Sequence, residues 1–133
     1  MIEAKVMWTD NFRFVGQASS GHGIVVDGAS KTGGSPMELV LIGLCACTGY
    51  DVASILGKKR EPFTSIEVRA EAERAATPPT VYTEIRLVYR VGGSVSHKAV
   101  EDAVRLSEEK YCSVAAMLRK TAKISYLIEY TDK

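Results

Sequence analysis

Neither sign of charge dominates this sequence. Its 17 basic and 16 acidic residues give a formal net charge of +1, and the two signs are interspersed along the chain. Proteins that bind nucleic acid or an anionic membrane surface usually carry a basic patch on one face. The sequence therefore predicts no nucleic-acid partner and no membrane partner.

The chain also lacks the signals of targeting and of modular organisation. Its first ten residues, MIEAKVMWTD, do not combine a charged start with the apolar core of a secretory signal. The longest apolar run is expected to be too short for a membrane span. Internal repeats, low-complexity segments and linkers are absent from the sequence. We expect a cytoplasmic protein with a single domain over residues 1–133.

Cysteine is scarce and odd in number. The three cysteines, Cys45, Cys47 and Cys112, do not suggest a disulfide framework in a reducing compartment. Cys45 and Cys47 would point to nearly opposite sides of a helix, so they cannot easily bond to each other or chelate a metal together. We expect no metal and no cofactor. The thiols are then either small buried core residues, which is common for free cysteine, or reactive groups.

Hydrophobic periodicity predicts an α+β fold with antiparallel pairing. The order is three short strands, a helix, two long strands, further helices and a last strand. In the hairpin of the two long strands, Glu84, Arg86 and Arg90 are expected to face opposite charges on the preceding strand. The predicted strands cover residues 3–8, 12–18, 23–28, 65–75, 81–91 and 123–130, and the helices cover 35–56, a segment beginning at 96, and 113–119.

The first helix has clear end signals and an unusual surface. Ser35 and Glu38 form a Ser-x-x-Glu capping box around Pro36, and Gly57 is expected to stop the helix. From Leu39 to Cys47 its residues are apolar or small on every side, so this part must be buried all round. One small sheet covers only one face. We therefore infer a second chain, in an interlocked homodimer.

Cys112 lies just before the short third helix, in EEKYCSVAAML. Ser113 is the predicted cap of that helix. Free amide groups and the positive end of a helix dipole favour a thiolate at such a place. If a reactive cysteine needs a disulfide partner, Cys112 is the candidate.

These segments together resemble a known family. The run SPMELVLIGLCACTGYDVASIL, preceded by SGHGIVVD and followed by YCSVAAML, is similar to the OsmC/Ohr family of thiol-dependent peroxidases, and more closely to its OsmC-like branch. The likeness covers essentially the whole chain. It implies antiparallel sheets wrapped around a long buried central helix in an intertwined homodimer, with two active sites at the subunit interface.

The resemblance assigns roles to two thiols. Cys47 stands at the peroxidatic position and Cys112 at the resolving position. The Cys47 thiolate would attack an organic hydroperoxide and become a sulfenic acid, Cys112 would trap it as a disulfide, and an external dithiol would reset the enzyme. Leu39, Ile42, Leu44 and residues of the partner chain would line an apolar substrate pocket. Cys45 has no counterpart and is interpreted as a packed core residue.

The charged part of the resembling site is less regular. In the family an arginine from the N-terminal strands and a glutamate near the helix start support the nucleophile. Arg13 and Glu38 are the candidates here, although Arg13 fits an outward charge on a strand equally well. The family's glutamate directly follows the proline, where this chain has Met37. Glu38 lies roughly 13 Å along the helix from Cys47 and out of phase with it, so it fits the capping box better.

Two other readings of the same residues stay open. The fold could serve as a non-catalytic module that binds a small molecule, its peroxidase machinery having decayed at Met37. It could also be a redox sensor whose disulfide changes a partner contact. Asp51, one turn after Cys47, favours these alternatives because a nearby carboxylate opposes thiolate formation.

Overall fold

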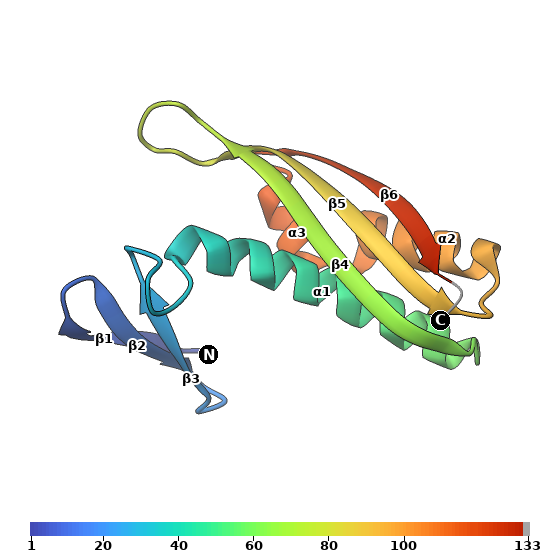
Figure 1. The fold of residues 1–133 in the computed structure, drawn as a ribbon, viewed down its shortest axis with the longest axis horizontal. Helices are drawn as coiled ribbons and strands as arrows, with labels where there is room; N and C mark the ends of the chain where they lie inside the picture. The colour runs from blue at the N-terminus through green and yellow to red at the C-terminus, as the bar shows by residue number, and fades with distance from the viewer. Residues whose placement is uncertain (132–133) are drawn as a thin grey trace. The chain divides into compact units, whose positions relative to one another are not determined.

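The computed structural model describes residues 1–131 and confirms the α+β class and the predicted order of elements (Figure 1). Its elements are β1 (Ala4–Asp10), β2 (Arg13–Ala18), β3 (Gly23–Asp27), α1 (Pro36–Lys58), β4 (Phe63–Arg74), β5 (Tyr82–Gly93), α2 (His97–Leu106), the π-helical turn η1 (Ser107–Tyr111), α3 (Ser113–Leu118) and β6 (Lys123–Thr131). The π-helical turn was not foreseen from the sequence.

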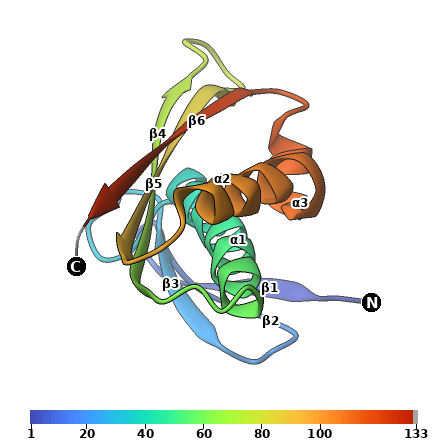
Figure 2. The same ribbon diagram turned by 90° about the vertical axis from the view of Figure 1, so that its right-hand side faces the viewer.

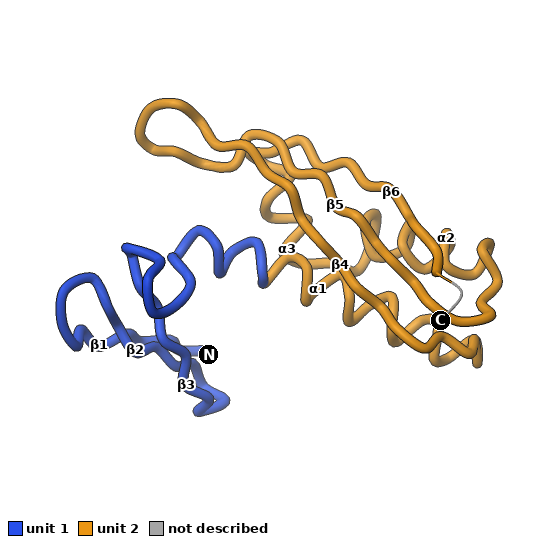
Figure 3. The backbone as a smooth tube through the Cα atoms, in the orientation of Figure 1, with its two compact units in different colours: residues 1–42 blue, residues 43–133 orange. Residues whose placement is uncertain are grey.

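The chain forms two compact units (Figure 3). The first covers residues 1–42 and the second begins at Gly43, so the boundary falls inside α1. A single domain over residues 1–133 stays a prediction. Each unit contains one three-stranded sheet, β1-β2-β3 in the first and β4-β5-β6 in the second.

The first unit is an antiparallel meander whose last turn is held by one carboxylate. Asp27 is only 3% exposed and accepts hydrogen bonds from the N–H of Ala29 at 2.8 Å, and from the N–H and hydroxyl of Thr32 at 3.0 and 2.8 Å. The turn also passes close to β3, because a Cβ on Gly33 would lie 2.7 Å from the carbonyl oxygen of Val25. These contacts fix the path into α1.

Both ends of α1 are locally determined. The capping box is confirmed: the Ser35 N–H donates to Glu38 Oε1 at 2.9 Å and the Glu38 N–H donates to Ser35 Oγ at 3.3 Å. The predicted C-terminal end of α1, at Gly57, comes too early in the sequence. Gly57 lies inside the helix, and Arg60, with φ of 58°, forms the left-handed end. Its N–H bonds Gly57 O while Glu61 N–H bonds Leu56 O, which is a Schellman motif.

In the second unit β5 is the central strand, and it is the most buried one. β4 pairs with it antiparallel as predicted, and Arg86 forms an ion pair with Glu71 across the hairpin. Glu84 instead faces Glu73, so the expected charge match fails there. β6 pairs with β5 in parallel, which corrects the expectation of antiparallel pairing throughout. The parallel pairing follows from the crossover through α2, η1 and α3.

The helices of this unit cover one face of its sheet (Figure 2). α1 contributes a stripe of four buried side chains at i, i+4 spacing, which face the sheet: Leu44, Thr48, Val52 and Leu56. Gly49 allows close contact with β4, since a Cβ there would lie 3.4 Å from Val68 Cγ2. Each fully buried Leu or Val side chain contributes about 1.5–3 kcal/mol, so this stripe anchors the helix.

α1 is also long and apolar enough, by length and composition, to cross a membrane. Its most apolar 18-residue window has a mean hydropathy of 1.9. This corrects the expectation that no apolar run reached such a length. Core helices of soluble proteins pass the same test, and α1 packs its buried stripe against a sheet. The absence of a membrane partner stays a prediction.

Candidate functional site

The second unit brings two of the predicted thiols together. Cys47 lies in α1, and Cys112 lies at the junction of η1 and α3. All three cysteines are free thiols, and Cys47 lies near enough to Cys112 to raise the pKa of its thiol. Their separation of 65 residues in the sequence, from 47 to 112, is closed by the packing of α1 against the α2–η1–α3 segment.

The environment of Cys112 differs from the expected one. Cys112 itself, and not Ser113, is the N-cap of α3, and its Sγ accepts a hydrogen bond from the Ala115 N–H at 3.4 Å. Burial is the main cause that raises the pKa of the Cys112 thiol, the Ala115 N–H lowers it, and the neighbouring Cys47 and Asp51 side chains raise it, so that the pKa is about 12. The Ala115 N–H at the helix end thus favours a Cys112 thiolate as expected, but burial outweighs this effect.

Cys45 takes no part in this pair. It is half-buried, and partial burial raises the pKa of its thiol. Its position two residues before Cys47 turns it away from the Cys112 side of the helix. Within residues 1–131, no group of three or more His, Cys, Asp or Glu side chains is arranged to hold a metal ion.

A buried polar network adjoins the thiol pair, and the sequence analysis missed it. The Thr48 hydroxyl lies 2.5 Å from Tyr89 OH and 2.8 Å from Ser107 Oγ. Ser107 Oγ lies 2.8 Å from Asp51 Oδ2, and Tyr89 OH donates to Glu108 Oε1 at 2.6 Å. Thr48, Tyr89 and Ser107 are fully buried, and Glu108 is 5% exposed. Burial and the Glu108 carboxylate raise the pKa of Tyr89, so its phenol stays protonated.

An arginine holds the segment that carries Cys112. Arg119, the C-cap of α3, donates to both the carbonyl and the carboxylate of Glu108, and the two side chains form an ion pair. The Cys112 N–H also closes η1 onto Ser107 O at 2.9 Å. One signal could have revealed this clamp: Glu108 continues the buried i, i+4 stripe of Val100 and Val104, where a charged residue needs a partner.

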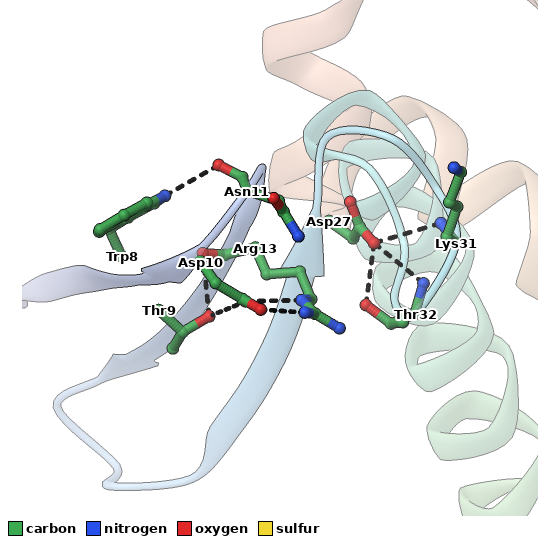
Figure 4. A network of polar contacts seen from close by, with 8 residues as sticks. All are labelled: Trp8, Thr9, Asp10, Asn11, Arg13, Asp27, Lys31 and Thr32. Carbon is green, nitrogen blue, oxygen red and sulfur yellow. Dashed lines mark hydrogen bonds and ion pairs between the residues drawn. The ribbon is translucent and has the colours of Figure 1, made fainter.

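Arg13 is held by a different carboxylate from the one expected. In the first unit its Nε donates to Asp10 Oδ1 at 2.7 Å, and its Nη2 pairs with Asp10 Oδ2 (Figure 4). The Asp10 carboxylate raises the pKa of the Arg13 guanidinium, which stays charged. Asp10 lies at the irregular end of the β1–β2 pairing, opposite Arg13. The role of Arg13 toward Cys47 stays a prediction.

Glu38 is used at the helix start. Besides the capping box, its Oε1 accepts a hydrogen bond from Ser30 Oγ at 2.9 Å. The Ser35 N–H, together with the Ser35 and Ser30 hydroxyls, holds the pKa of Glu38 below its ordinary value. These contacts support the capping interpretation over a catalytic one. A catalytic role for Glu38 stays a prediction.

The predicted apolar lining is only partly available. Leu44 is fully buried against the sheet of the second unit, so it does not reach a substrate within the chain, whereas Ile42 is 58% exposed. A surface pocket lies next to the polar network, lined by Tyr50, Asp51 and Tyr111 together with Ser54, Ile55, Lys58, Lys59 and Leu106. Asp51 therefore connects the buried network with a solvent-facing pocket.

Sequence comparison assigns this α+β fold to a known class of protein. The OsmC-like protein family matches residues 28–126, and the chain belongs to this family. It is 42% identical over 130 residues to Protein YhfA of Escherichia coli strain K12, covering 96% of this chain and 97% of that protein.

Two solved structures show how far the fold is shared. A hypothetical protein from Aquifex aeolicus VF5 superposes with a TM-score of 0.85 at 35% identity, covering 99% of this chain and 98% of the other. An organic hydroperoxide resistance protein OsmC from Legionella pneumophila superposes with a TM-score of 0.71 at 14% identity, covering 97% and 96%. The second likeness shows the fold alone.

Proposed function

We propose that this protein is a thiol-dependent reductase of organic hydroperoxides, with Cys47 as the peroxidatic and Cys112 as the resolving cysteine. The observation that supports the proposal is that Cys47 lies near enough to Cys112 in the second unit to raise the pKa of its thiol. Both thiols are free, and Cys112 is buried beside Cys47. The hydroperoxide resistance protein that shares the fold supports the substrate class.

The reaction has three steps. The Cys47 thiolate attacks the terminal oxygen of the hydroperoxide, the O–O bond breaks, and the remaining alkoxide leaves as an alcohol after gaining a proton. Cys112 then attacks the sulfur of the Cys47 sulfenic acid, which gives a disulfide and water. An external dithiol reduces the disulfide. The proximity of Cys47 to Cys112, close enough to affect the Cys112 pKa, supports the second step.

A homodimer is part of the proposal. Apolar side chains of α1 remain exposed in the single chain, including Val40 at 36% and Ile42 at 58%, and a second copy would cover them. Such an interface would also supply the apolar pocket that rewards an alkyl substrate. Sedimentation analysis should give the mass of two chains. A cytoplasmic location stays part of the proposal.

The enzyme can be tested with stoichiometric oxidant. Reduced wild-type protein, Cys47→Ser and Cys112→Ser are each treated with one equivalent of cumene hydroperoxide or hydrogen peroxide, and disulfides are mapped by mass spectrometry. We expect rapid Cys47–Cys112 disulfide formation in the wild type and a trapped Cys47 sulfenic acid in Cys112→Ser. Cys47→Ser should react no faster than a free thiol. Cys45→Ser is the matched control and should behave like the wild type.

The two alternatives give different results in the same experiment. A small-molecule binding module would oxidise as slowly as a free thiol with either peroxide. A redox sensor would form the disulfide but show no sustained turnover when a dithiol is supplied. Either result would count against the reductase.

A further inference from the structure

Four short contacts between oxygen atoms connect two carboxylates through three buried hydroxyls. From one end to the other they join Asp51 to Ser107 at 2.8 Å, Ser107 to Thr48 at 2.8 Å, Thr48 to Tyr89 at 2.5 Å and Tyr89 to Glu108 at 2.6 Å. They link α1, η1 and β5 inside the second unit. No described buried side-chain N or O atom lacks a hydrogen-bond partner.

This series of side chains has one hydroxyl proton fewer than it has contacts. Each of the four contacts needs one hydrogen between its oxygens, but the hydroxyls of Ser107, Thr48 and Tyr89 supply three. With both end groups ionised, one pair of oxygens at these distances would face each other with lone pairs alone. Both carboxylate oxygens of Glu108 already face a donor, Tyr89 OH at Oε1 and Arg119 Nη2 at Oε2. The missing hydrogen is then supplied at the Asp51 end.

We propose that this series of hydrogen-bonded side chains, which begins at Asp51 and ends at Glu108, holds one proton beyond its three hydroxyl protons. We propose that it relays protons during formation of the Cys47–Cys112 disulfide. This role rests on the proposed function. A shift of each hydroxyl proton to its neighbour moves the extra proton from one carboxylate to the other, so the chain can take up a proton at one point and release one at another.

The resolving step needs such a group. When the Cys112 thiol attacks the Cys47 sulfenic acid, an S–S bond forms and the S–O bond breaks. The Cys112 sulfur is oxidised and the Cys47 sulfur is reduced. The thiol must lose its proton, and the departing oxygen must gain one to leave as water. Asp51, one helical turn after Cys47, donates its proton to the departing oxygen, and the carboxylate that this leaves accepts the Cys112 proton, so the proton count of the relay is restored.

The groups around Cys112 fit this role. Asp51 and Tyr89 both interact electrostatically with the thiol, from α1 and β5 respectively. Glu108 of η1 forms an ion pair with Arg119 at the end of α3. Burial holds the pKa of Cys112 near 12, so the thiol does not ionise unaided at neutral pH. Asp51 also lines a surface pocket, where it can exchange protons with water.

Two substitutions interrupt the relay in different places. Thr48→Val keeps the shape of the side chain and deletes the central hydroxyl, and Asp51→Asn removes the acid at the end. Glu109→Gln is the control. Glu109 lies on η1 next to Glu108, but its side chain is 68% exposed and makes none of the four contacts. Protein is mixed with one equivalent of cumene hydroperoxide, and the sulfenic acid and disulfide are quantified by quenched-flow mass spectrometry.

We expect disulfide formation to slow by about 10²-fold in Thr48→Val and Asp51→Asn, the lower end for lost acid–base catalysis, and to be unchanged in Glu109→Gln. Sulfenic acid formation should be unchanged in Thr48→Val. It should also be unchanged in Asp51→Asn, because the protonated Asp51 side chain and the asparagine that replaces it are both uncharged. A general loosening of the fold would slow both steps together. Wild-type rates of disulfide formation in both variants would overturn the relay.

The extra proton has its own readout, which does not need activity. Infrared spectra of the reduced protein at neutral pH should show the C=O band of a protonated carboxyl group that shifts in D₂O and is missing in Asp51→Asn. Absence of this band in the wild type would refute the proton count. If no Cys47 sulfenic acid forms in the wild type, the proposed function fails and the relay's role fails with it, while the infrared band still decides the proton count separately.

Discussion

Replacing Glu108 by glutamine is the most direct test of the clamp that holds the Cys112 segment. Glutamine has nearly the same size and can still accept the hydrogen bond from Tyr89 through its amide oxygen. Its NH₂ group would face the Arg119 guanidinium, so a donor meets a donor where a carboxylate stood. The variant thus removes the ion pair and keeps the packing.

The expected cost follows from burial at the two ends of the pair. A hydrogen bond to a charged group contributes about 1.5–3 kcal/mol. The Glu108 side chain is 5% exposed, but the Arg119 side chain is 37% exposed and regains water when its partner is lost. The Arg119 bond to the Glu108 carbonyl also remains. We expect a loss of about 2 kcal/mol in the free energy of unfolding.

Urea denaturation of the reduced protein at one fixed concentration measures this loss. With a slope of about 1–3 kcal/mol per M, the midpoint should fall by about 1 M. Fixed concentration matters because a dimer links stability to mass action. The adjacent and exposed Glu109→Gln serves as control and should change stability by less than about 0.5 kcal/mol. Equal midpoints for the two variants would refute the structural role of the clamp.

Four other outcomes follow from the structure. The folded state raises the pKa of Cys112 from 9.0 to about 12, so the reduced protein should lose stability as the pH rises through this window. Urea titrations at several pH values measure this loss. The loss should be smaller in Cys112→Ala. The Ala29 N–H and then the Thr32 hydroxyl and N–H lower the pKa of Asp27 from 3.8 to about 2. The ionised Asp27 therefore stabilises the folded state fully above about pH 4, and this stabilisation is lost toward pH 2. Asp27→Asn should remove this acid dependence of the free energy of unfolding. Gly33→Ala should destabilise the first unit, since its Cβ would lie 2.7 Å from a carbonyl oxygen, and amide hydrogen exchange in β3 should speed up. Cys45→Ala should leave the Cys47–Cys112 disulfide yield after oxidation unchanged, as peptide mapping would show.

Much of the fold could be predicted from the sequence because its signals are local. The capping box at Ser35 and Glu38 and the alternation in β4 depend on neighbouring residues, and both are present in the structure. The parallel pairing of β6 could not be predicted from alternation, which is the same in either direction. The prediction that Gly57 ends α1 was wrong, because the residue with the left-handed conformation is Arg60, three residues later.

The candidate site was harder to predict than the fold. The thiol pair was anticipated from a family resemblance, and in the structure Cys47 lies near enough to Cys112 to raise the pKa of its thiol. The ion-pair partner of Arg13 and the burial of Cys112 were not anticipated. Asp10 holds Arg13 across a β-turn, and burial dominates Cys112 although it caps a helix. Both outcomes depend on which groups surround a side chain in space, which spacing along a helix does not report.

The sequence by itself determined the start of α1, the strand periodicity and the family to which the chain belongs, because each is encoded by residues a few positions apart or by a recognisable run. Tertiary structure alone decided the direction of the last strand and the polar network, because Thr48 meets Tyr89 and Ser107 across 41 and 59 positions of chain. A buried hydroxyl finds its partner through packing, and packing joins segments that are distant in the sequence.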